Sequence, residues 1–88
     1  MHERKIAQDL VRTAGVTALD EGARRVRSMK VRVGALSHID PEALRGQVEW
    51  WSHGTIAEGA LVVVERSGSD IGDRHSQEVR LVSVDVEA

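Results

Sequence analysis

Residues 28–51, SMKVRVGALSHIDPEALRGQVEWW, decide the fold, because they join a strand to a helix through one short connection. Apolar residues alternate with polar ones from Met29 to Val33, and this pattern is typical of a strand with one buried and one exposed face. We therefore predict a strand over Arg25–Leu36.

A helix start follows directly. Asp40 is a favourable N-cap, and Pro41 suits the first helical position, where no backbone N–H is needed. Apolar residues then recur at helical spacing: Leu44, Val48 and Trp51. Gly54 supplies a stop, so the sequence predicts a second helix from Pro41 to about Gly54.

The flanking segments complete the pattern. An amphipathic stripe predicts a helix over about Arg4–Glu21, and Gly22 ends it. Two valine-rich runs, Ala60–Glu65 and Val79–Val86, read as strands. The polar loop 66–77 is predicted to join them as an antiparallel pair. The order helix-strand-helix-strand-strand indicates a two-layer α+β domain over residues 1–88, with two helices on one face of a three-stranded sheet.

The alternation in the strands also predicts a surface. If Met29, Val31 and Val33 face the helices, their natural partners on that face are Val62, Val64, Val82, Val84 and Val86. Four large apolar residues remain for the uncovered face: Leu61, Val63, Val79 and Leu81. Patches of that kind often mark interfaces, so we expect a homodimer or a docked partner there.

Composition excludes several classes of protein. The net charge of −2 and the two aromatic residues disfavour nucleic-acid binding. No apolar run approaches the about 20 residues of a membrane helix, and charged residues interrupt any signal peptide, so we expect a cytoplasmic protein. The chain contains no cysteine, which excludes thiolate metal sites. Neither a catalytic triad motif nor a phosphate-binding glycine loop is present, so we expect no enzyme.

The triplet Met1-His2-Glu3 is the candidate metal site. The Met1 amine, the His2 amide and the His2 imidazole lie within one short chelate. A planar set of nitrogen donors that includes a deprotonated amide suits square-planar Ni(II) or Cu(II) better than tetrahedral zinc.

A fourth donor is needed. Glu3 is nearest in sequence, through its amide or its carboxylate. His38 and Asp40, before the second helix, are the distant candidates, although Asp40 is already accounted for as an N-cap. His53 is interpreted as a charge at a helix C-terminus, and His75 as an exposed loop residue.

Several segments together resemble one family. These are Met1-His2-Glu3 followed by Ile6-Ala7, the strand Val31-Arg32-Val33-Gly34, Pro41-Glu42-Ala43-Leu44-Arg45, and Gly54-Thr55-Ile56-Ala57-Glu58-Gly59-Ala60. In this order they resemble the HypA/HybF hydrogenase nickel-incorporation proteins. The resemblance runs from residue 1 to about residue 65, and the last strand is also similar to that of the family.

The resemblance implies a nickel metallochaperone for [NiFe]-hydrogenase maturation that works with a nickel-incorporation GTPase and the apo-hydrogenase. It also implies that Met1, His2 and Glu3 supply the Ni(II) site. Members of this family normally insert a zinc-binding domain with two Cys-x-x-Cys pairs between the last two strands. Here the loop 66–77 stands at that place, so we expect Ni(II) but no zinc.

Two functions of different class therefore remain. The chain is either a zinc-free nickel carrier, or a degenerate relative that acts as a protein-interaction module without metal delivery.

Overall fold

The computed structural model describes residues 3–67 and 78–88. Its elements follow the predicted order: α1 (Glu3–Asp20), β1 (Arg25–Val33), α2 (Pro41–Trp51), β2 (Leu61–Arg66) and β3 (Val79–Glu87). Each lies within about three residues of its predicted position. The largest difference is at the ends of β1 and α2, which stop at Val33 and Trp51.

The caps of the helices agree with their sequence. Gly22, two residues beyond the end of α1, adopts a left-handed φ of 72°, which is typical of a C-terminal helix stop. At α2, Asp40 has an extended backbone, and its Oδ1 accepts a hydrogen bond of 3.1 Å from the backbone N–H of Glu42. Ser52 is the C-cap residue of α2, its backbone N–H donates to the Val48 carbonyl, and Gly54 lies in the turn that follows.

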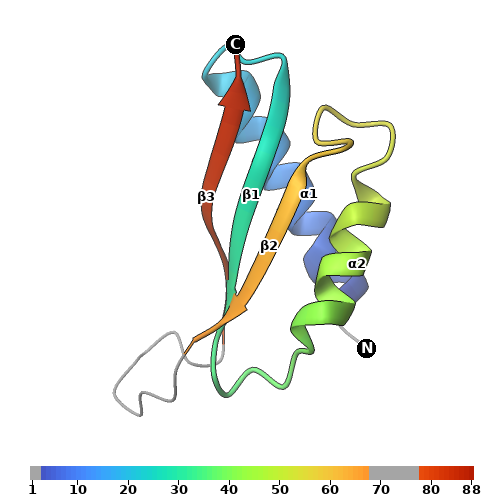
Figure 1. The fold of residues 1–88 in the computed structure, drawn as a ribbon, viewed down its shortest axis with the longest axis vertical. Coiled ribbons are helices and arrows are strands. Elements are labelled where there is room, and N and C mark those ends of the chain that lie inside the picture. The colour runs from blue at the N-terminus through green and yellow to red at the C-terminus, as the bar shows by residue number, and fades with distance from the viewer. Residues whose placement is uncertain (1–2, 68–77) are drawn as a thin grey trace.

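The sheet has the strand order β2-β1-β3, with β1 in the centre (Figure 1). β1 is parallel to β2 and antiparallel to β3. The prediction that β2 and β3 form an adjacent antiparallel pair is therefore wrong. The crossover through α2 returns the chain parallel to β1, and β3 then pairs with the free edge of β1 instead of the free edge of β2.

Both helices cover the same face of this sheet, which confirms the predicted two-layer α+β architecture (Figure 1). The core between the layers consists of small and aliphatic side chains. Its largest fully buried members come from β1 and α2: Met29, Leu44, Val26, Val31, Val33 and Val48.

The predicted apolar patch on the uncovered face is wrong. β3 contains a bulge, because Lys30 of β1 pairs with Ser83 whereas the next residue pairs with Leu81. Val82 is the extra residue and is 38% exposed, so Val79 and Leu81 turn toward the helices and pack against the core. Leu61 and Val63 remain exposed on β2, while Val62 is buried and Val64 packs on the core as predicted. The four residues proposed for a homodimer interface thus do not share a face.

Three charged side chains on the exposed side of α2 form ion pairs whose geometry can be tested. The Arg45 guanidinium donates hydrogen bonds to Glu42 (2.8 Å) and Glu49 (3.1 Å). The hydrogen bond and the charge of Arg45 lower the pKa of the Glu42 carboxyl below its usual value. A carboxyl with a lowered folded-state pKa contributes stability above its unfolded pKa and loses it as the pH falls through the folded pKa.

We expect Arg45→Gln to raise the Glu42 pKa toward that of an isolated glutamate, measured by carboxyl ¹³C NMR titration. Arg12→Gln is the matched control, since Arg12 lies on the other helix beside Asp9. An unchanged Glu42 midpoint in Arg45→Gln would show that the ion pair does not persist in solution.

Candidate metal site

The predicted site begins where α1 begins. Met1 and His2 lie outside the described residues, and Glu3 is the first residue of α1. The first turns of the helix are fixed by packing, because Leu10 is buried and Ile6 packs against the core. The structure therefore makes Glu3, the last residue of the triplet, the first residue of a firmly held helix.

The two basic residues after the triplet have partners of their own. The guanidinium of Arg4 lies 5.4 Å from the ring centroid of Trp51 on α2, which is cation–π geometry. The Lys5 ammonium lies 3.7 Å from an oxygen of Asp9, one helical turn away. Arg4 thereby ties the start of α1 to the end of α2.

The loop that carries His38 and Asp40 lies beside the start of α1. Ser37 and Ile39 line the same groove as Ile6 and Asp9 of that helix. His38 is exposed and has a φ of 61°, the one left-handed φ among the non-glycine residues of the described chain. The fold thus brings this loop to the same end of the molecule as the start of α1 (Figure 1).

Asp40 serves the structure as a helix cap, as predicted. Its Oδ1 accepts the Glu42 N–H, and its side chain is exposed. An ionised carboxylate has a second oxygen and further lone pairs, so the cap does not occupy all of its capacity to accept. The structure does not test whether Asp40 is also a metal ligand, so that role stays a prediction.

Arg66 holds this loop in place, and sequence analysis missed it. It is the last residue of β2, and its guanidinium donates to the carbonyl oxygens of Gly34 (3.4 Å), Ala35 (3.5 Å) and Ile39. Three acceptors from one loop suit the several donors of a guanidinium. A lone arginine at a strand end gives no indication in sequence that it will span residues 34–39.

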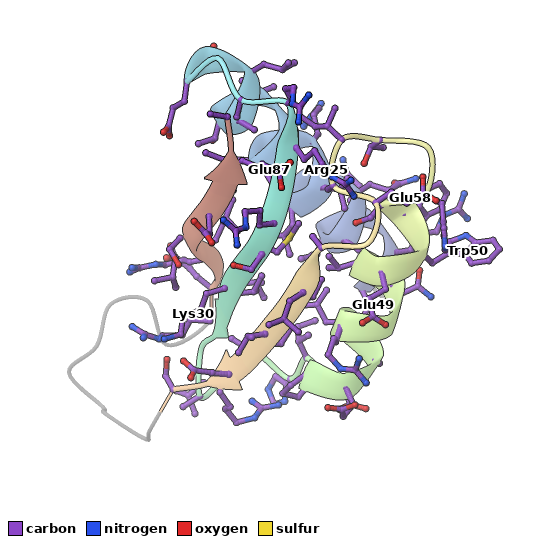
Figure 2. All side chains as sticks on the ribbon, turned by 45° about the horizontal axis from the view of Figure 1, so that its top comes forward. Arg25, Lys30, Glu49, Trp50, Glu58 and Glu87 are labelled. Atoms are coloured by element: carbon purple, nitrogen blue, oxygen red, sulfur yellow. The ribbon has the colours of Figure 1, made fainter. Side chains whose placement is uncertain are left out.

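His53 stands apart from this region. His53 lies after α2, where its Nδ1 is 2.9 Å from the Trp50 carbonyl and its ring meets the Trp50 ring edge-on at 5.7 Å. This agrees with its predicted position at a helix C-terminus. Trp50 itself projects from the fold and is 66% exposed (Figure 2). His75 lies outside the described residues.

Within residues 3–67 and 78–88, no three histidine or carboxylate side chains gather in a way that could hold a metal ion. In the same part of the chain, no helix is long and apolar enough to cross a bilayer.

Comparison with known proteins decides the family. Residues 1–85 match the family described as "Hydrogenase/urease nickel incorporation, metallochaperone, hypA". The chain belongs to the HypA family. That description names a metallochaperone and not an enzyme, in agreement with the expectation from sequence.

Two HypA relatives illustrate the similarity. The hydrogenase maturation factor HypA of Rhizobium leguminosarum bv. viciae is 38% identical over 66 residues, which are 75% of this chain and 58% of that protein. HypA of Pyrococcus furiosus is 40% identical over 65 residues, 74% of this chain and 47% of that protein. The chain thus matches less than two thirds of the length of these relatives.

The fold is also that of a solved HypA. The solution structure of the Ni metallochaperone HypA from Helicobacter pylori superposes with a TM-score of 0.84 and covers 100% of this chain and 99% of that one, at 16% identity. At this identity the likeness concerns the fold.

Proposed function

We propose that this HypA-family chain is a nickel carrier for the maturation of a nickel enzyme such as [NiFe]-hydrogenase. The observation that carries the proposal is the family match, which starts at residue 1 and so includes Met1-His2-Glu3. The fold supports it, because Glu3 is the first residue of a helix anchored on the core.

The Met1 amine, the His2 amide and the His2 imidazole are the proposed Ni(II) donors, with Glu3 completing the set through its amide or carboxylate. Nitrogen donors of this kind suit the planar coordination that Ni(II) accepts. The amine is a ligand only when Met1 is the terminal residue and is unmodified. His38 and Asp40 are the candidates for additional ligands, because their loop lies beside the start of α1.

The proposed recipients are a nickel-incorporation GTPase, the apo-hydrogenase, or both, with the cytoplasm as the place of delivery. A chelate at a chain end is open on one side, so an incoming ligand can displace its donors in turn. The chain has no cysteine, so we propose Ni(II) as the metal and no cysteine-held zinc. We further propose that residues 1–88 act as a single nickel-binding unit.

Titration of Ni(II) into the protein with its native N-terminus tests the proposal. Binding heat and d–d absorbance should report one Ni(II) per chain. We expect His2→Ala to weaken binding by at least about 100-fold, since it removes the imidazole and the chelate ring that the imidazole closes. His53→Ala is the control and should bind as the parent does. Equally weak binding in all three proteins would instead favour an interaction module without metal delivery.

Two further variants separate the additional ligands. Asp40→Asn removes the negative charge but keeps a residue that caps helices well, so α2 should retain its stability. His38→Ala removes the loop imidazole. A weaker Ni(II) affinity in either variant, at unchanged thermal stability, would assign that residue to the site. Unchanged affinity in both would leave the triplet as the complete ligand set.

A further inference from the structure

The face of the sheet that points away from the helices carries side chains whose neighbours are fixed by the strand pairing. Figure 1 views the sheet from this side, with α1 behind the strands. Val31 of β1 is buried, so its neighbours Lys30 and Arg32 project from the uncovered face. The parallel register of β2 places Val63 beside Lys30 and Glu65 beside Arg32. This face is therefore charged along β1 and partly apolar along β2.

Two large apolar residues of β2 lie on this face. Leu61 is 66% exposed and Val63 is 38% exposed, whereas Val62 between them is buried. They belong to the half of the sheet in which β1 and β2 are parallel. All-parallel sheets occur almost only where other elements cover both faces, and this half of the sheet has one face open. Leu61 and Val63 thus form an apolar surface of the kind that a further element normally buries.

Three positive charges gather at one end of the same face. Arg80 of β3 pairs directly with Arg32 of β1, and residues that pair in this way point to the same side of a sheet. Lys30 is the next outward residue of β1. Glu65 serves two of these cations, because its Oε1 lies 3.7 Å from the Lys30 ammonium and 4.0 Å from the Arg32 guanidinium. The cluster therefore has one carboxylate among three cations.

The fold does not neutralise this cluster. Like charges directly opposite one another on paired strands destabilise a sheet, so Arg32 and Arg80 repel each other. Arg80 is exposed and makes no ion pair within the described part of the chain. Asp85 also lies on this face, but it pairs with Ser28, farther along the strands. A positive surface remains on a chain whose net charge is −2.

A helix matches this surface in spacing and in width. Lys30 and Arg32 are two residues apart on a strand, which is about 6.6 Å. Carboxylates four residues apart on a helix are separated by about 6 Å along its axis and share one face. Strands lie about 4.8 Å apart and a helix is about 10 Å wide, so one helix spans both β1 and β2. Its second edge then covers Leu61 and Val63.

We propose that the uncovered face binds an acidic amphipathic helix of a partner protein. Carboxylates on one edge of this helix pair with Lys30, Arg32 and Arg80. Apolar residues on its other edge cover Leu61 and Val63. One helix buries less than the about 800 Å² per partner of a standard interface, so the complex is transient. The surface contains none of the proposed nickel donors, so the proposal stands or falls independently of the nickel site.

The helices of a second copy do not have the required chemistry. Glu42 and Glu49 of α2 both accept hydrogen bonds from Arg45. Asp9 of α1 lies 3.7 Å from the ammonium of Lys5. These carboxylates already have cations of their own chain beside them, so a partner with unpaired carboxylates is the better match.

Fluorescence anisotropy with a labelled synthetic helix tests the proposal. The probe is a peptide of about 20 residues, long enough to be helical, with one leucine edge and one glutamate edge. The metal-free protein should bind it, and should not bind the same peptide with glutamine in place of glutamate. Arg80→Glu should weaken binding by at least about tenfold, because it sets like charges against the probe. Arg12→Glu makes the same change of charge on α1 and should bind as the parent does.

Two comparisons separate binding from folding. Arg80→Glu removes the repulsion of Arg32, so the melting temperature should not fall while the affinity does. Leu61→Ser should also weaken binding of the probe. Leu19→Ser is its matched control, since Leu19 is 63% exposed on α1, and it should leave the affinity unchanged.

Three results would overturn the proposal. One is a parent protein that does not bind the glutamate probe, or an Arg12→Glu variant that loses as much affinity as Arg80→Glu. Another is a dimeric parent that Arg80→Glu and Leu61→Ser convert to monomers in sedimentation equilibrium, which would make the face an interface between copies. The third is tighter binding of a single-stranded DNA oligonucleotide of the same charge, which would assign the face to nucleic acid.

Discussion

Lowering the pH from about 7.5 to about 5.5 is expected to weaken Ni(II) binding by at least roughly 500-fold. The amine and the imidazole bind metal only when deprotonated. Their ordinary pKa values are about 7.8 for an α-amine and about 6.5 for an imidazole. Protons therefore compete with Ni(II) for both groups over this interval. The amide must also lose its proton, so the figure is a lower bound and affinity rises with pH.

Titration calorimetry at several pH values measures this dependence, and repetition in buffers of different protonation enthalpy counts the protons released. His2→Ala provides the comparison, because without the imidazole its affinity should fall less steeply below about pH 6.5. A flat affinity over the same interval would point to carboxylate ligands and against the terminal nitrogen donors.

Leu44→Ala is expected to lower the free energy of unfolding by about 2–5 kcal/mol, because it leaves a cavity in a packed core. Leu44 lies on α2 and is completely buried against the sheet. Domains of this size have a total stability of about 5–15 kcal/mol, so this one substitution removes a large part of it. Urea denaturation followed by circular dichroism gives the value.

Leu36→Ala is the matched control for this effect. Leu36 is 53% exposed in the loop before α2, so its truncation removes little buried surface. We expect a change within about 0.5 kcal/mol. Equal losses in the two variants would show that α2 does not pack on the sheet as described.

The elements themselves could be predicted because their causes are local. Asp40 and Pro41 form a helix start that depends only on neighbouring backbone groups, and the structure has that cap. The alternation from Met29 to Val33 marks a half-buried strand, and these apolar residues are buried. Local patterns of this kind survive in the fold because tertiary packing reinforces them.

The arrangement of the strands could not be predicted in the same way. The bulge at Val82 depends on the pairing of β3 with β1, and it reverses the facing of Val79 and Leu81 relative to a regular strand. The position of β3 beside β1 likewise depends on the crossover through α2. Neither feature leaves a pattern within the strand sequence itself.

The candidate site has one part that the sequence predicts and one part that only the fold reveals. The triplet is recognisable from its chemistry and its place before a helix. The proximity of the His38 loop to that helix is a tertiary fact, fixed by Ile39 in the groove and by the bonds from Arg66 at the end of β2. Sequence spacing indicates neither contact, because each joins segments about 30 residues apart.

The most direct test of the nickel site is a Ni(II) titration of the protein with a free Met1 amine beside the same protein with that amine acetylated. Acetylation changes no side chain and leaves the fold in place, so it isolates the terminal donor. For the free form we predict one bound Ni(II) per chain and a d–d absorbance spectrum typical of planar Ni(II). The acetylated form should show neither the stoichiometric binding nor that spectrum. Identical affinity and spectrum in the two forms would contradict a nickel site built on Met1, His2 and Glu3.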